Sequence, residues 1–426
     1  MNYKLSKIAL TSLLLILCSY NNIMAEENNI QTDADLIKIN ISTKENIEPT
    51  VLNLFNTLKL AKENNLQLAI SKDVIKENKI KLDEIRNKRL FLFFKFANAR
   101  ALENSAHYSL ESAKAKYKTT QNTVLADTTK KYYNLIKAVS AKQIAKNFLK
   151  QGELSLHENE RLLEQGDSTK FEVKQTEVFV ENLKQKLLES EIAFMMASVD
   201  VSQYINQKDI AMKILPQECD SSNEDNEGDI NIAILTLIPE DVLLNDCIEL
   251  AIQNRPELKE LENNIKSLEQ LIIATKFDEI KIKTLEAQIS QLKSSELLLK
   301  NTVKSTVTTA LLQLIGSKNQ IDVAKQKLSL SKKALEQAQI TRKEGLGTNK
   351  NVLDAQVNLA QAKNDYINSI ITYNLAQINL LKELGTISIS TIEKNKPIDI
   401  PKLENNNIKQ SQVSENETEK DDEEDK

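Results

Sequence analysis

The stretch EGLGTNKNVLDAQ, residues 344–356, carries the residue types of a phosphate-binding loop. Gly345, Gly347 and Lys350 follow a G-x-G-x-x-K pattern, and Asp354 lies four residues further on. Glycines let backbone N–H groups approach a phosphate, and a lysine at this spacing would add a positive charge. Such a loop normally follows a β-strand, so its meaning depends on the elements on either side.

The histidines and cysteines offer little for catalysis or metal binding. His107 and His157 are the only histidines, and they lie far apart without cysteine neighbours, which argues against a zinc site. Cys219 and Cys247 could pair in an oxidising compartment, and the sequence leaves this open. No base, nucleophile or metal cluster accompanies the glycine motif. We therefore expect no enzyme, no catalytic residue and no cofactor.

The composition is that of long helices. The chain has seven Gly, six Pro and no Trp in 426 residues, and no proline lies between Thr50 and Ile210. Abundant Ala, Leu, Lys, Glu and Gln favour helices and coiled coils. A net charge of −5 and a pI near 5.6 give no basic surface for nucleic acid. The sequence predicts an elongated protein dominated by α-helices.

The first 25 residues are organised like a secretory signal peptide. Lys4 and Lys7 precede the apolar run 8–18, and Ala25 is the small residue at the expected cleavage site. Cys18 is a candidate for lipid attachment, although bulky residues precede it where small ones are expected. The run is too short to span a bilayer, which takes about 20 residues, and no later segment is apolar for 18 residues. We expect an exported chain.

Two recurring segments indicate an internal duplication. Residues 58–70 resemble residues 248–261, which aligns Asn64 with Asn254 at the start of each copy. Pro256 follows in the second copy. A second pair of similar segments surrounds Gly166 and Gly345. The chain therefore reads as two copies of one unit.

A heptad pattern follows each of these two glycines. Large side chains recur every seven residues on one row, and mostly small ones occupy a neighbouring row. The large residues are Val173, Val180, Leu187, Phe194 and Val201 in the first copy, and Val352, Leu359, Tyr366, Tyr373 and Leu380 in the second. Such a seam lets two helices pack closely. Each half is predicted to be an antiparallel pair of long helices joined at the glycine.

The glycines therefore follow helices rather than strands. The first copy retains only Gly166, so the phosphate-loop pattern is not shared between the copies. We interpret Gly166 and Gly345 as left-handed C-caps, which make a turn between two helices. The N-cap candidates for the outgoing helices are Ser168, Thr169, Thr348 and Asn349.

These patterns divide the chain into six predicted segments. They are a signal peptide over 1–25, a polar leader over 26–50, a first helical repeat over 51–215, an acidic linker over 216–240, a second helical repeat over 241–390, and an acidic disordered tail over 391–426.

Three motifs resemble those of the TolC-type outer-membrane efflux factors. NRPEL (254–258) is similar to the opening of that family's second repeat, GLGTNKNVLDAQ (345–356) to its glycine tip, and YNLAQINLLKELGTI (373–387) to its closing helix. The resemblance covers about 50–387. It implies a homotrimer that forms a periplasmic tunnel ending in an outer-membrane β-barrel. It also implies contact, through a periplasmic adaptor, with an inner-membrane pump.

The resemblance also assigns roles to particular residues. It implies that Asp354 lies near the tunnel's periplasmic constriction, whereas Asn351 stands where a second aspartate is often found. A solvated carboxylate in the first turn of a helix, favoured by the helix dipole, would equally explain Asp354. The implied periplasmic tip turns are Gly166, Gly345 and Gly347, and the repeat-start motif comprises Asn64, Asn254 and Pro256.

The barrel strands that the resemblance implies are poorly represented. A transmembrane strand needs about 9–11 residues of alternating pattern, and only 90–99 and 276–285 approach this. The phenylalanines of 90–99 would equally suit a helix packed in a core. We predict duplicated helical hairpins with a reduced or absent β-barrel. The predicted function is an outer-membrane exit duct of a tripartite efflux or type I secretion system; the alternative is a periplasmic structural coiled coil without a barrel.

Overall fold

The computed structural model describes residues 50–91, 96–206, 214–216, 232–275 and 278–401. All described residues belong to one compact unit, which lies within Glu48–Lys426. The elements are β1 (Thr50–Leu52), α2 (Leu54–Asn64), α3 (Leu66–Phe91), α4 (Phe96–Gln165), α5 (Lys170–Tyr204), β2 (Ile214–Pro216), α6 (Leu244–Asn254), α7 (Pro256–Ala274), α8 (Glu279–Lys343), α9 (Asn349–Glu383) and α10 (Ile389–Lys394). The predicted helical fold class is confirmed.

Two helices are much longer than those of an ordinary domain. α4 has 70 residues and α8 has 65, so α4 alone extends about 105 Å at 1.5 Å per residue. Neither contains proline, and each contains one glycine, Gly152 and Gly316. Within the described ranges, no helix combines the length and apolarity needed to cross a membrane.

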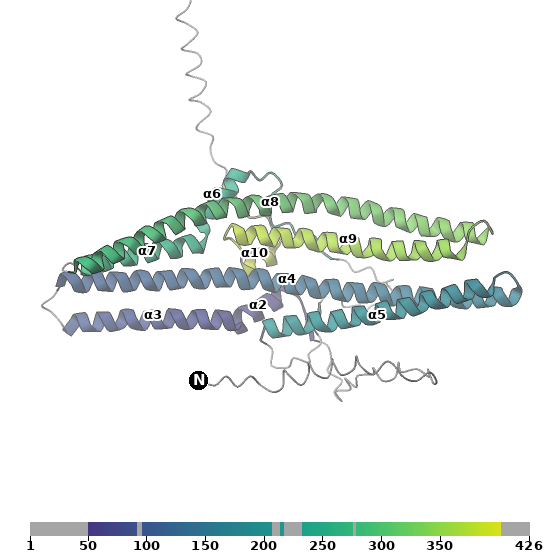
Figure 1. The fold of residues 1–426 in the computed structure, drawn as a ribbon, viewed down its shortest axis with the longest axis horizontal. Helices are drawn as coiled ribbons and strands as arrows, with labels where there is room; N and C mark the ends of the chain where they lie inside the picture. Colours follow the sequence, from purple (N-terminus) through teal and green to yellow (C-terminus); the bar gives the residue numbers. More distant parts are fainter. Residues whose placement is uncertain (1–49, 92–95, 207–213, 217–231, 276–277, 402–426) are drawn as a thin grey trace, which may run out of the picture. The chain divides into compact units, whose positions relative to one another are not determined.

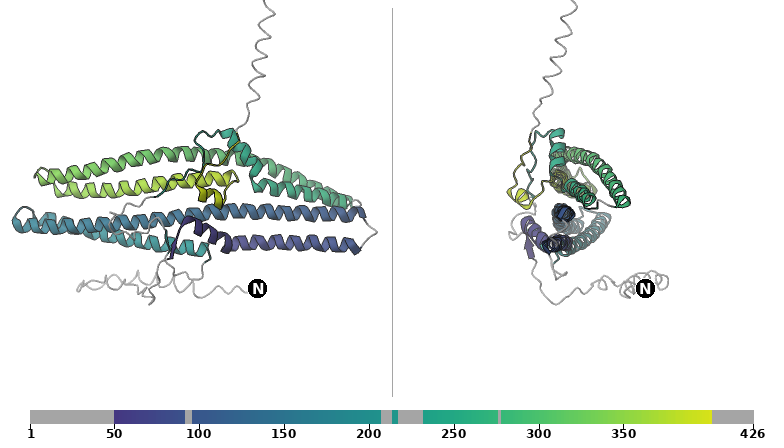
Figure 2. Two further views of the ribbon diagram at one scale, coloured as in Figure 1. Left: turned by 180° about the vertical axis from the view of Figure 1, so that it is seen from behind. Right: turned by 90° about the vertical axis from the view of Figure 1, so that its left-hand side faces the viewer.

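The long helices pack in a fixed order. On the side of the two glycine turns, α5 packs on α4, α4 on α9, and α9 on α8 (Figure 1). Toward the opposite end, α3 packs on α4, α4 on α7, and α7 on α8, and Figure 2 shows the same neighbours from two other directions. α4 and α8 therefore run through both halves, whereas the shorter helices cover one half each.

The predicted heptad seams are the buried faces of the two hairpins. The buried members are Val173, Thr176, Val180, Ser190, Phe194 and Val201 on α5, and Val352, Ala355, Leu359, Ala362, Ser369, Ala376 and Leu380 on α9. Leu187, Tyr366 and Tyr373 are half-buried. The second heptad row of each helix consists mostly of small side chains. α5 can therefore approach α4, and α9 can approach α8, along most of their lengths.

The opening helix of each repeat is broken at an equivalent residue. Asn65 separates α2 from α3, and Arg255 separates α6 from α7, with extended ψ angles of 128° and 122°. Pro256 disfavours helical ψ at the residue before it and then occupies the first position of α7. Asn65 needs no proline, because its side-chain oxygen accepts a hydrogen bond from the Gln67 N–H (3.0 Å).

The segment before α6 is held by side-chain amides of α9. The Asn374 amide accepts from the Leu235 N–H (2.8 Å) and donates to the Ala233 carbonyl (2.9 Å). The Gln377 amide accepts from the Leu237 N–H and donates to the Leu235 carbonyl, both at 2.6 Å. Both amide side chains are fully buried. Their bonds satisfy backbone groups that have no neighbouring strand at these positions.

Two predicted boundaries differ from the structure. The linker predicted over 216–240 contains the packed segment just described, in which Ile232 and Leu235 are buried. The tail predicted from 391 begins inside α10. Beyond α10, the Ile398 N–H donates to the Leu237 carbonyl (3.0 Å), which ties the two segments together. The signal peptide, Cys18, Cys219 and the residues after 401 lie outside the described residues.

The two segments considered as membrane strands are helical where they are described. α3 extends to Phe91 and α4 begins at Phe96, so of the two interpretations of 90–99 the helical one is confirmed at both ends; residues 92–95 lie outside the described residues. The second candidate, 276–285, is helical from Glu279 onward. The Asp278 side chain caps α8 by accepting from the Lys281 N–H (3.0 Å). β1 and β2, the strands within the described ranges, have three residues each and pair in parallel.

The tight approach of Gly385 to the α6–α7 break gives a first prediction. Gly385 has φ +71°, and a Cβ there would lie 3.0 Å from the Asn254 carbonyl group, whereas Gly166 has φ +84° with nothing within 4 Å. Gly385→Ala should therefore lower the free energy of unfolding by about 2–4 kcal/mol, and Gly166→Ala by about 1–2 kcal/mol. Chemical denaturation checks this. Equal losses would mean that Gly385 is needed only for its backbone angle.

Candidate functional site

The first glycine turn ends α4 in a Schellman motif. Gly166 is left-handed, and its N–H donates to the Leu163 carbonyl (3.1 Å). The Asp167 N–H donates to the Leu162 carbonyl (2.9 Å). These bonds satisfy carbonyls that the helix end would otherwise leave unpaired. The predicted left-handed C-cap is confirmed at this position.

The second turn repeats this geometry, and more of its backbone N–H groups than in the first turn donate to carbonyls at the end of the incoming helix. Gly345 has φ +75°, and its N–H donates to the Arg342 carbonyl (3.0 Å). The Leu346 and Gly347 N–H groups both donate to the Thr341 carbonyl (3.0 Å each). A Cβ at Gly347 would lie 3.1 Å from the Arg342 nitrogen, so a larger residue here would be crowded against the end of α8. These amides bind the end of α8 and do not form a phosphate cradle.

Threonine caps the outgoing helix at both turns. The Thr169 hydroxyl accepts from the Glu172 N–H (3.2 Å), and the Glu172 carboxylate accepts from the Thr169 N–H (3.3 Å), which forms a complete capping box. The Thr348 hydroxyl accepts from the Asn351 N–H (3.3 Å). Of the four N-cap candidates, Thr169 and Thr348 are the caps.

A buried polar cluster joins the two hairpins close to their turns. The Thr176 hydroxyl accepts from the side-chain amides of Asn159 and Asn349, both at 2.8 Å, and donates to the Glu172 carbonyl (2.9 Å). Arg342 donates to the Asn159 amide oxygen. The cluster thus links α4, α5, α8 and α9. The one sequence signal for it is that Arg342 stands where Leu163 stands in the first copy.

Asp354 lies on α9, away from this cluster. Its side chain is exposed, and among the described residues it has no hydrogen bond or ion pair. Asn351, one turn earlier, is exposed as well. The structure therefore does not bring Asp354 together with the glycines, and a role at a constriction stays a prediction.

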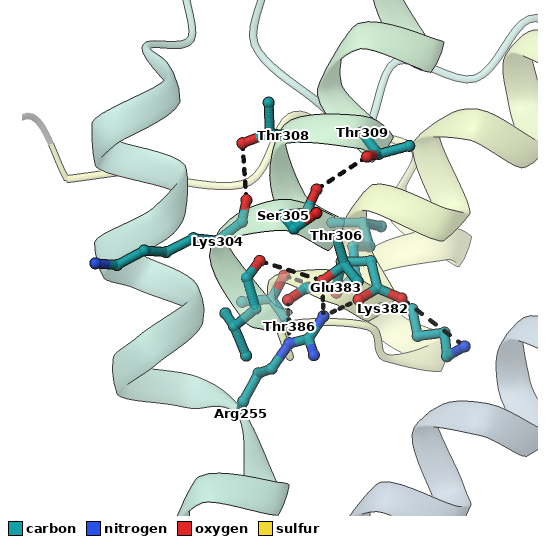
Figure 3. Close-up of polar contacts among 11 residues, drawn as sticks. Arg255, Lys304, Ser305, Thr306, Thr308, Thr309, Lys382, Glu383 and Thr386 are labelled. Carbon is teal, nitrogen blue, oxygen red and sulfur yellow. Dashed lines mark hydrogen bonds and ion pairs between the residues drawn. The ribbon is translucent and has the colours of Figure 1, made fainter. Parts of the chain in front are cut away.

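The start of the second repeat is locked to the end of α9 by Arg255. Its Nε donates to the Glu383 carbonyl (2.7 Å), and one terminal nitrogen forms an ion pair with the Glu383 carboxylate (Figure 3). The same nitrogen donates to the Thr306 hydroxyl on α8 (3.2 Å). Burial lowers the pKa of the Arg255 guanidinium, and nearby Glu257 opposes that shift. Arginine stays charged regardless, so the buried cation depends on these partners.

The first repeat makes the same contact with different chemistry. The Asn65 amide donates to the carbonyl of Tyr204 (3.1 Å), the last residue of α5. The backbone then turns left-handed at Asn206 (φ +51°), as it does at Gly385. The residue after each predicted repeat-start asparagine therefore makes the contact. Asn64 itself is exposed, and Asn254 contributes its backbone to the packing against Gly385.

Comparisons with known proteins identify the fold. No protein-family model matches the chain, and no curated protein matches its sequence. Among solved structures, the Campylobacter jejuni CmeC outer membrane channel is 12% identical, with 88% of this chain and 97% of that chain covered and a TM-score of 0.64. A membrane protein from Pseudomonas aeruginosa is 13% identical, with 78% and 93% covered and a TM-score of 0.66.

A third structure gives the same result. The open state of the Neisseria gonorrhoeae MtrE outer membrane channel is 14% identical, with 78% of this chain and 89% of that chain covered and a TM-score of 0.61. The chain therefore has the fold of the TolC-type outer-membrane efflux channels, as its motifs indicated. At these identities the match concerns the fold.

The buried ion pair gives a second prediction. Arg255→Ala should lower the free energy of unfolding by about 2–4 kcal/mol, because the largely buried Glu383 carboxylate keeps only its longer ion pair with Lys382 (3.9 Å). The double variant Arg255→Met, Glu383→Leu removes both charges and should recover most of that loss. Chemical denaturation of the single and double variants checks this. A double variant no more stable than Arg255→Ala would show that the two charges are not coupled.

Proposed function

We propose that this protein is the outer-membrane exit duct of a tripartite efflux or type I secretion system. One observation carries the proposal: the arrangement of long helices matches solved outer-membrane channels over 78–88% of the chain. The duct would pass substrates outward and carry out no reaction itself. Its location would be the outer membrane, with the helices of both repeats in the periplasm.

The helix order supports assembly as a homotrimer. α5 and α8 lie at the two edges of the α5–α4–α9–α8 layer, and both have exposed apolar side chains. Large exposed apolar faces on a water-soluble surface usually mark contacts with other chains. Three layers joined edge to edge would enclose a tunnel.

The two turns are suited to contact with a periplasmic adaptor, and through it with an inner-membrane pump. Leu346, between the two glycines of the second turn, is 80% exposed, and Phe171, just after the first turn, is 75% exposed. The hydrogen-bonded turns place these apolar side chains at the surface. Hydrophobic side chains presented this way provide binding energy when a partner covers them.

The alternative function is a structural coiled coil of the periplasm. One observation favours it: within the described ranges the strands are β1 and β2, three residues each. Membrane fractions washed with carbonate or urea separate the two functions. A duct stays in the outer-membrane pellet, whereas a soluble coiled coil is released.

Asp354 provides a direct test of the duct. In a trimer, three copies of this carboxylate would surround one axis. At about 10 Å in water, each pair repels by only ~0.4 kcal/mol, and salt screens part of it, so the ring is tolerable. It would nonetheless concentrate cations at the entrance. Asp354→Ala should lower the cation preference measured in planar bilayers and leave assembly unchanged.

A gain-of-charge variant controls for this test. Asn351→Asp adds a carboxylate one turn from Asp354 at an exposed position, so it should raise the cation preference. If the unmodified protein forms no pore in the bilayer, the duct is contradicted and the coiled coil replaces it. Pores indifferent to both substitutions would place Asp354 away from the constriction.

A further inference from the structure

α5 carries a second apolar seam on the face opposite its buried one. Val178, Leu188 and Met195 belong to one heptad pattern, in which they are separated by ten and seven residues. They are 54%, 55% and 39% exposed. The buried seam of Val173 and Thr176 lies on the other side of the helix. A helix with two opposed apolar seams is built to pack between two neighbours.

α8 has a matching second seam. Ile340, Leu330 and Val323 are 44%, 69% and 66% exposed, and they too are separated by ten and seven residues, counted backward along the chain. The buried seam of α8, which contains Val307, Leu314 and Ile321, lies on the opposite face. Within the described chain, α4 and α9 lie between α5 and α8, so neither outer seam covers the other.

The two outer seams are complementary in an antiparallel arrangement. α5 runs away from its glycine turn and α8 runs toward its own, and both turns lie at the same end (Figure 1). The equal spacings then align Val178 with Ile340, Leu188 with Leu330, and Met195 with Val323. The layers between the first two pairs are polar on both sides: Glu181 with Gln337 and Gln185 with Lys333. Between the last two pairs, the exposed Ile192 lies opposite Gln326.

We propose that α5 of one copy docks antiparallel on α8 of the next copy in this alignment, an inference that rests on the proposed duct. The partner that covers each outer seam is a second copy of this chain, because α5 and α8 of the same chain carry the two complementary seams. Contacts of this head-to-tail kind generate a closed ring when the rotation between copies permits. The ring buries the apolar edges that a single copy exposes.

The contacts inside one copy set the relative height of the two hairpins. Thr176, ten residues after Gly166, bonds Asn349, four residues after Gly345. At this contact, the second turn therefore ends six residues short of the first turn, measured along the helices. Farther from the turns, the Asn374 amide donates to the Tyr133 hydroxyl (3.2 Å). At this contact the second turn ends four residues short of the first.

The proposed alignment fits this offset between the two turns better than the alignment shifted by one heptad does. It places Val178, twelve residues from the first turn, beside Ile340, five residues from the second. The second turn must then end seven residues short of the first. A shift of the alignment by one heptad would instead place the two turns level with each other. That shift would pair Leu188 with Val323 and would set Glu181 against Leu330, so a carboxylate would be buried on a leucine without a partner.

Cysteine pairs distinguish the two alignments. Disulfides form only when two Cα atoms lie within about 7 Å, and a shift of one heptad moves a helical residue by about 10 Å. In the full-length exported protein under mild oxidation, Leu188→Cys with Leu330→Cys should give a ladder of covalent oligomers. Leu188→Cys with Val323→Cys should give no more than the single variants, which control for reaction with native cysteines. Cys247 is fully buried, and burial raises its thiol pKa to about 11.

Light scattering of the non-oxidised protein separates this inference from the proposed function. Oligomers that cross-link through Leu188→Cys with Val323→Cys, or through neither pair, overturn the alignment and leave the duct intact. A protein that stays a single copy overturns both. A ladder that ends at three copies supports alignment and trimer together, whereas one that ends elsewhere keeps the alignment and contradicts the trimer.

A charge substitution tests the seam without cysteines. Leu188→Asp should weaken assembly, because the carboxylate would be buried against Leu330 of the neighbouring copy. Leu154→Asp is the matched control: Leu154 is a similarly exposed leucine on α4, outside both seams. Equal loss of assembly in the two variants would contradict the proposed seam.

Discussion

The fold depends on covering the apolar residues of α4 along its whole length. A helix of 70 residues cannot bury its apolar face against itself, and no single partner here is as long. Partners therefore succeed one another along it: α3 and α7 toward one end, α5 and α9 toward the other, and α2 near the middle. Where partners change, helices must begin or end beside α4, and the chain needs caps and breaks at these places.

The duplication survives in backbone geometry more clearly than in residue type. At the junction where each opening helix breaks, Asn65 and Arg255 both donate to the last carbonyl of their closing helix, although one is a neutral amide and the other a cation. The left-handed residue that follows is Asn206 in one copy and Gly385 in the other. Asparagine is one of the few residues besides glycine that tolerates this conformation. The two copies therefore share the backbone angle and the bond, although the side chains that provide them differ.

Sequence reasoning could predict the features that depend on local periodicity. The heptads, the glycine caps and the scarcity of breakers define the hairpins, because each acts within a few turns of helix. The polar cluster of Asn159, Thr176 and Asn349 was beyond reach, because it joins residues up to 190 positions apart that carry no distinctive spacing. The weak alternation of 276–285 suggested a strand, whereas Asp278 and the later burial of Leu285 and Ile289 at helical spacing favour α8.

The amides of Asn374 and Gln377 recognise only the main chain of the segment they hold. Peptide N–H and C=O groups are the same for every residue except proline, so this contact is insensitive to the identity of the exposed Ile234 between its bonds. It is sensitive to length instead. One inserted residue would turn each carbonyl to the wrong side and leave two buried amides unpaired. Across related chains, the exposed position 234 should vary freely, whereas the number of residues between the bonded positions should hardly vary.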